Sequence, residues 1–189
     1  MAKMKFNGFV EKISGSVGGL VVRKGRRGKY TLSNKPDFSE VVPSLAQMGQ
    51  RKVFGRAVEY ANAVKANPDK LAFYEGLAQQ KDMPTFALCV GDYLNAPTMD
   101  DLDLSIYKGK VGDSILIATH DDVGVISVNV ELTRMDGANI ERGQAINLGA
   151  GNWAYIATVP VAAGTDIFIE AEALDRPGNR TVCSANPTI

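Results

Sequence analysis

The chain has 189 residues, with 21 basic and 21 acidic side chains, so its formal net charge is zero. This length is sufficient for one large domain or two small ones with a sizeable hydrophobic core. No run of 18 apolar residues is present, which argues against a transmembrane helix. Asn7, Gly8, Glu11 and Lys12 stand where a signal peptide would be apolar, so we expect no classical export signal.

The zero net charge hides a strong asymmetry along the chain. Residues 1–81 contain 15 basic and 6 acidic side chains, a net charge of +9, whereas residues 82–189 contain 6 and 15, a net charge of −9. Such complementary halves favour packing against each other, or head-to-tail association between copies that is strongest at low salt. The alternative is that a basic region simply precedes an acidic one, and salt dependence would separate the two.

Residues 1–35 are predicted to form a basic β-ribbon. The run KFNGFVEKI alternates in the way of a strand, and two further short strands flank the tip Gly25-Arg26-Arg27-Gly28. Such a ribbon is marginally stable alone and needs a surface to pack on. We therefore expect it to add strands to a neighbouring subunit. The predicted assembly interface consists of Phe6, Phe9, Val10, Leu20, Val21, Val22, Arg23, Lys24, Arg26, Arg27, Lys29 and Tyr30.

The same ribbon could instead bind a groove of DNA or RNA through its basic residues. This alternative is the weaker one, because Tyr30 is the only aromatic side chain near the tip that could stack on a base. The acidic remainder of the chain also opposes binding to nucleic acid. The basic residues that would carry it are Arg23, Lys24, Arg26, Arg27 and Lys29.

Residues 36–98 are predicted to be a linker followed by a helical segment. The linker runs from Pro36 to Pro43, and apolar residues at helical spacing then predict a helix from Leu45 that ends before Pro68. A second helix is expected from Asp69 and a third over about Thr85 to Leu94. Their aromatic residues are expected to build a small core and not a ligand-binding site.

Residues 99–189 are predicted to form an antiparallel β-sandwich, so the expected fold class is α+β. The runs DSILIAT and GVISVNVELTR alternate with a period of two, and ERGQAINL, NWAYIATV, DIFIEAEAL and NRTVCSA follow. About seven short strands at intervals of 8 to 12 residues are typical of a sandwich with Greek-key connections. Trp153 is expected to lie in its core.

The run ALDRPGNRT, preceded by WAYIATVPVAAGTDIFIEAEA, resembles the closing strands of bacterial immunoglobulin-like domains. The whole chain, with its ribbon motif Ser14-Gly15-Ser16-Val17-Gly18, resembles small uncharacterised bacterial and phage-associated proteins that carry such a ribbon ahead of helices and an immunoglobulin-like module. The resemblance implies an immunoglobulin-like sandwich and a place on a cell surface or a virion. It implies no enzymatic activity.

Residues for catalysis are not brought together by the sequence pattern. His120 is the only histidine and is followed by two aspartates, without a glycine-flanked serine or a recognisable oxyanion hole nearby. We therefore expect a protein that is not an enzyme and has no cofactor. Cys89 and Cys183 lack the spacing of a zinc site, and buried free thiols are favoured over a disulfide.

One set of residues could hold calcium. In an immunoglobulin topology the loop between the second and third strands meets the loop between the sixth and seventh. These loops carry Asp121, Asp122, Asp175 and Asn179, whose oxygens suit Ca²⁺. The alternative is a solvated turn in which Asp175 and Asn179 bond their own backbone, and the lack of dense DxDxD spacing favours it.

These patterns predict a structural subunit that self-assembles through heterologous, head-to-tail contacts into an extracellular filament or a similar assembly. The first alternative is a surface or virion module that binds a carbohydrate or protein through sandwich loops, with Trp153, Tyr155 and Tyr107 as its aromatic contacts if they are exposed. The second alternative is the nucleic-acid binder. The predicted partner is therefore a further copy of the chain.

Overall fold

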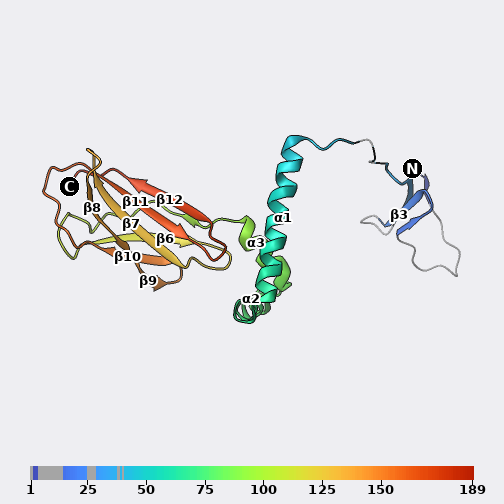
Figure 1. Cartoon of the computed structure of the whole chain (residues 1–189), viewed down its shortest axis with the longest axis horizontal. Coiled ribbons are helices and arrows are strands. Elements are labelled where there is room, and N and C mark those ends of the chain that lie inside the picture. Colours follow the sequence, from blue (N-terminus) through green and yellow to red (C-terminus); the bar gives the residue numbers. More distant parts are fainter. Residues whose placement is uncertain (1, 4–14, 25–28, 38, 40) are drawn as a thin grey trace. The chain divides into compact units, whose positions relative to one another are not determined.

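The structure is a computed structural model that describes residues 2–3, 15–24, 29–37, 39 and 41–189 (Figure 1). The chain divides into two units, Met1–Leu45 and Ala46–Ile189, so the helices and the C-terminal strands belong to the same unit. The described residues form three helices and three four-stranded antiparallel sheets. The expected α+β class is therefore confirmed.

The first unit contains a small sheet with the order β1-β4-β3-β2. Its strands are β1 (Ala2–Lys3), β2 (Gly15–Val17), β3 (Leu20–Lys24) and β4 (Tyr30–Asn34). Among the described side chains of this unit only Val22 is buried, and Leu20 is 40% exposed. The described part of this sheet therefore has very little core of its own. Phe6, Phe9, Val10, Arg26 and Arg27 of the predicted interface lie outside the described residues.

Three helices open the second unit at the predicted positions. They are α1 (Leu45–Ala66), α2 (Pro68–Gln80) and α3 (Thr85–Leu94). Asn67 separates the first two, and its side-chain oxygen accepts a hydrogen bond of 3.1 Å from the backbone N–H of Lys70, which caps α2. No helix in the described part of the chain is long and apolar enough to cross a bilayer. The helices share a small core of Ala61, Val64, Tyr74, Ala78, Leu88 and Cys89.

The remaining strands form two sheets around one larger core (Figure 1). The first sheet, in the order β5-β6-β10-β9, contains β5 (Thr98–Met99), β6 (Ser114–His120), β10 (Asn152–Ile156) and β9 (Ile146–Gly149). The second, in the order β12-β11-β7-β8, contains β12 (Arg180–Ala185), β11 (Ile167–Leu174), β7 (Ser127–Arg134) and β8 (Asn139–Gln144).

The inward faces of these strands agree with the alternation in the sequence. Ile115 and Ile117 of β6 are buried, as are every second residue of β7 and of β11. Trp153 of β10 is 4% exposed and lies in the core, as predicted. Burial of these apolar side chains contributes most of the favourable free energy of folding in this unit.

One predicted strand is divided in the structure. The run ERGQAINL reads as a single strand, but β8 ends at Gln144 and β9 begins at Ile146 in the other sheet. Ala145 lies between them, is buried, and donates its backbone N–H to the carbonyl of Val128 at 2.8 Å. The chain changes sheets at this small residue, which local alternation alone does not reveal.

A tight contact at Gly151 closes the turn between β9 and β10. The carbonyl of Gly151 accepts hydrogen bonds from the backbone N–H of Thr119 at 2.8 Å and from its hydroxyl at 2.9 Å. That hydroxyl oxygen in turn accepts a hydrogen bond of 3.1 Å from the indole of Trp153. Gly151 has a φ of +79°, and a Cβ there would fall against the carbonyl oxygen of Thr119.

We predict that Gly151→Ala lowers the free energy of unfolding by roughly 1–3 kcal/mol more than Gly149→Ala, because of the added steric overlap. Gly149 is the matched control, since its φ of +91° is also positive but a Cβ there meets no atom within 4 Å. Urea denaturation of both variants measures the difference. Equal destabilisation would show that backbone conformation, and not the contact with Thr119, decides the cost.

Candidate functional site

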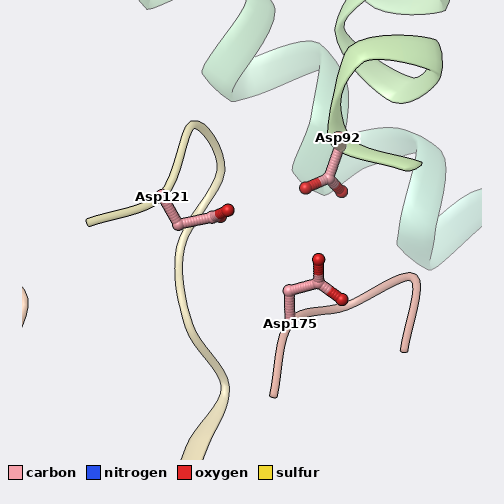
Figure 2. Close-up of side chains that lie close together, drawn as sticks. All are labelled: Asp92, Asp121 and Asp175. Carbon is pink, nitrogen blue, oxygen red and sulfur yellow. The ribbon is translucent and has the colours of Figure 1, made fainter. Parts of the chain in front are cut away.

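Three aspartates from separate elements converge in the second unit (Figure 2). Asp92 lies on α3, Asp121 lies in the loop after β6, and Asp175 lies in the loop after β11. One carboxylate oxygen from each lies within 4.8 Å of the others, and the three carboxylates point toward a common centre. We refer to these residues as the aspartate cluster.

Asp92 is placed by the buried side of α3. Leu88, Cys89 and Asp92 recur at helical spacing, and all three are buried. Its Oδ2 accepts a short hydrogen bond from the hydroxyl of Tyr74 on α2. The hydroxyl of Tyr74 is also 2.7 Å from that of Tyr60 on α1, and since Tyr74 donates to Asp92, Tyr60 donates to Tyr74.

The second oxygen of Asp92 is left without a partner. Asp92 is 1% exposed, and its Oδ1 is buried with no hydrogen-bond partner among the described residues. The ion pairs found in the described part of the chain do not involve any member of the aspartate cluster. An unpaired buried carboxylate is costly unless it is protonated or coordinates a cation.

Asp121 and Asp175 are positioned by their own loops. Oδ2 of Asp121 accepts hydrogen bonds from the backbone N–H groups of Val123, at 3.0 Å, and Gly124. Oδ1 of Asp175, which is fully buried, accepts them from the N–H groups of Gly178 at 2.8 Å and Asn179 at 2.6 Å. These backbone donors fix both carboxylates in place.

The other two residues of the predicted calcium set have different contacts. The side-chain N–H of Asn179 donates to Oδ2 of Asp175 at 2.8 Å and to the carbonyls of Asp92 and Tyr93 at 3.2 Å each. It therefore ties its loop to the end of α3. Asp122 is exposed, and its Oδ2 accepts a hydrogen bond of 3.0 Å from the side chain of Asn95.

The sequence reasoning found two members of the aspartate cluster and missed the third. It placed Asp121 and Asp175 at one end of the sandwich from the expected topology, and their carboxylates do meet there. It missed Asp92, although an ionisable residue on the apolar stripe of a helix is a signal of an unusual environment. Nothing in the sequence indicates that α3 approaches these loops.

The surroundings of Asp92 change the ionisation of this group. Burial, followed by the negative charges of Asp121 and Asp175, raises the pKa of the Asp92 carboxyl from 3.8 to about 6, against the opposing effect of the hydrogen bond from Tyr74. Burial is also the main cause that raises the pKa of the Tyr74 hydroxyl, so this group stays protonated and remains a donor. At pH 7 the Asp92 carboxyl is therefore largely ionised, and it becomes protonated as the pH falls through about 6.

The remaining residues considered for chemistry do not form a second site of this kind. His120 is exposed, and its Nε2 lies 3.3 Å from Oδ2 of Asp100. Tyr107, Trp153 and Tyr155 are only 3–4% exposed, so they are not available to stack on a carbohydrate. Cys89 and Cys183 are free thiols, and burial raises the pKa of Cys89 to about 11.

A second feature is an apolar surface with acidic residues along one side. In the sheet β5-β6-β10-β9, Ile146 pairs with Ala154, and Ala154 pairs with Leu116. The side chains of these three paired residues lie on the opposite side of the sheet from the core residues Ile115 and Trp153. A groove of about 550 Å³ on this side is lined in part by Leu116, Leu148 and three aspartates. We call this surface the acidic-edged face, and its residues are Leu116, Ile146, Leu148, Ile156, Asp100, Asp101 and Asp103.

Comparisons with protein-family models, with curated proteins and with solved structures found no match to this chain. The resemblance to immunoglobulin-like domains and to phage-associated proteins therefore stays a prediction. Any function has to be argued from the two features described above.

We predict that, with divalent cations chelated, the protein loses stability as the pH rises from about 4 to about 7, by up to about 2 kcal/mol. The folded pKa of Asp92 is raised above the unfolded value of 3.8. The stability that comes from its protonation is therefore fully present below 3.8 and is lost as the pH passes about 6.

The control for this prediction is Asp92→Asn. The amide keeps an acceptor for the hydroxyl of Tyr74 but does not ionise. The variant should show a flatter dependence of the urea midpoint on pH, and it should be the more stable protein at pH 7 in the absence of divalent cations. An unchanged pH profile would mean that another group causes the loss.

Proposed function

We propose that this protein is a structural subunit that assembles head-to-tail with copies of itself. In this arrangement the N-terminal sheet of one copy packs on the acidic-edged face of the next and adds its strands at β9. The observation that carries the proposal is the exposure of Ile146 (58%) and Leu148 (60%) on the edge strand β9, on a sheet whose opposite edge carries three exposed aspartates. The contacts would be heterologous, so the assembly can grow into a filament or close into a ring.

The chemistry of the acidic-edged face supports a protein partner. Ile146, Leu148 and Ile156 are each 38–60% exposed, which forms an apolar patch on one side of the sheet. All four residues of β9 are exposed, and among the described strands β9 is the last in its sheet. Its outer edge can therefore pair with another strand, although the N–H of Gly149 already bonds Oδ1 of Asn147. An apolar patch beside a free edge is suited to strand addition.

The chemistry of the N-terminal unit supports its role as the occupant of that face. Residues 1–35 contain nine basic side chains and one acidic side chain, which complements the three aspartates of the face. Among the described residues, Arg23, Lys24 and Lys29 are exposed, and Leu20 presents apolar surface beside them. β2 is the last strand on its side of this sheet. Both sides of the proposed contact therefore combine apolar side chains, a strand edge and complementary charge.

We also infer that the C-terminal sandwich is immunoglobulin-like. Its strand orders support this assignment, because β5-β6-β10-β9 corresponds to the order A-B-E-D and β8-β7-β11-β12 to the order C′-C-F-G. It differs from antibody domains in that Trp153 lies on the strand equivalent to E and the cysteines are free. An assembly on a cell surface or a virion is consistent with this type of module.

We predict that the wild-type chain forms filaments or rings at low salt that shorten at high salt, since complementary charges are screened by ions. Two variants should each be monomeric. The face variant carries Ile146→Lys and Leu148→Lys, and the ribbon variant carries Arg23→Glu and Lys24→Glu. Negative-stain electron microscopy and analytical ultracentrifugation at both salt concentrations measure the size of the particles.

Mixing the two variants is the decisive step. A head-to-tail contact predicts a dimer with one copy of each variant, because the intact ribbon of one still fits the intact face of the other and both ends are then blocked. The control is Val182→Lys, which changes a residue that is 52% exposed on the second sheet and should leave assembly unchanged. A wild-type chain that is monomeric at low salt, or a mixture that stays monomeric, would refute the proposal.

A further inference from the structure

We propose that the aspartate cluster binds Ca²⁺, and that the ion joins α3 to the two loops of the sandwich that follow β6 and β11. The ligands are carboxylate oxygens of Asp92, Asp121 and Asp175. This inference is independent of the proposed assembly, because it concerns a different part of the second unit.

The distances suit an ion with oxygen ligands. Ca²⁺ binds oxygens at about 2.3–2.6 Å, so two ligands of one ion lie at most about 4.6–5.2 Å apart. The three carboxylate oxygens lie within 4.8 Å of one another, and they converge from separate elements on one centre (Figure 2). A set made only of carboxylates favours a hard cation such as Ca²⁺ and is poorly suited to Zn²⁺, which prefers nitrogen and sulfur ligands.

The burial of Asp92 provides a second and independent reason. Its Oδ1 is buried, has no partner among the described residues, and belongs to a side chain that is directed at the centre of the cluster. The other oxygen is occupied by the hydroxyl of Tyr74. A cation would satisfy the orphaned oxygen and offset the cost of placing three carboxylates together, two of which are buried.

No basic side chain in the described part of the chain forms an ion pair with the aspartate cluster, and Arg176 acts on Asp92 only as a more distant positive charge. Arg176 is the basic residue next to Asp175, but its guanidinium lies 3.7 Å from the centre of the Phe73 ring. The hydrogen bonds to Asp121 and Asp175 come from backbone N–H groups and from the side-chain amide of Asn179, which are uncharged donors and position the carboxylates without neutralising the centre between them. The cluster is therefore held ready for an ion of positive charge.

The position of the site gives the ion a structural consequence. Asp92 comes from the helical segment, whereas Asp121 and Asp175 come from two loops of the sandwich. The side chain of Asn179 already bonds the carbonyls of Asp92 and Tyr93, and the hydroxyl of Thr181 bonds the carbonyl of Pro97. Calcium would add the strongest link at this junction and hold α3 against the loops.

The test uses the full chain with CaCl₂, MgCl₂ or TbCl₃ as the only added cation. We expect saturable Ca²⁺ binding by calorimetry with a Kd of about 10⁻⁴ to 10⁻³ M or tighter, and a rise in Tm on adding CaCl₂. We also expect Tb³⁺ luminescence sensitised by tyrosine, because Tyr74 contacts a ligand of the ion. Mg²⁺ should bind more weakly.

A matched pair of variants assigns the ligands. Asp121→Asn removes a charge from the cluster, and Asp121 is only partly buried, so the variant should fold. It should weaken Ca²⁺ binding by about tenfold or more, whereas Asp122→Asn, whose carboxylate instead faces Asn95, should leave it unchanged. Absence of saturable Ca²⁺ binding at millimolar concentration, or an equal loss in both variants, would overturn the proposal.

Discussion

The concentration of negative charge at the end of the sandwich is the constraint on which the second unit depends. Asp92 and Asp175 are buried, and Asp121 lies beside them. Buried carboxylates are tolerated only where hydrogen bonds, a proton or a cation offset the loss of hydration. The structure supplies backbone donors to Asp121 and Asp175 and the hydroxyl of Tyr74 to Asp92, and it leaves one oxygen of Asp92 unsatisfied.

The elements that carry the aspartate cluster are held in place by two hydrophobic cores. The loops that carry Asp121 and Asp175 begin at the ends of β6 and β11, whose inward side chains lie in the core shared by both sheets. α3 is held by the helical core and by hydrogen bonds from Asn179, and Thr181 bonds the carbonyl of Pro97 just beyond its end. Groups on rigid elements keep their geometry without paying the entropy of ordering when an ion binds.

The N-terminal unit presents the opposite situation. Among its described side chains only Val22 is buried, and Arg23, Lys24 and Lys29 are exposed. The acidic-edged face of the second unit has exposed apolar residues and an unpaired strand edge. The basic side chains of one surface complement the acidic side chains of the other, and both surfaces expose apolar residues. These features favour the proposed association between copies over a carbohydrate site, which would depend on aromatic residues that are buried.

The sequence by itself determined the elements and the faces that are buried, because helical spacing and strand alternation are local properties. It predicted three helices close to their observed positions, the inward residues of β7 and β11, and the meeting of Asp121 with Asp175. Only the tertiary structure decided that the chain changes sheets at Ala145, that Asp92 joins the cluster and that Ile146 and Leu148 stay exposed. These outcomes depend on which distant elements pack together, and alternation within one segment contains no information about its neighbours in space.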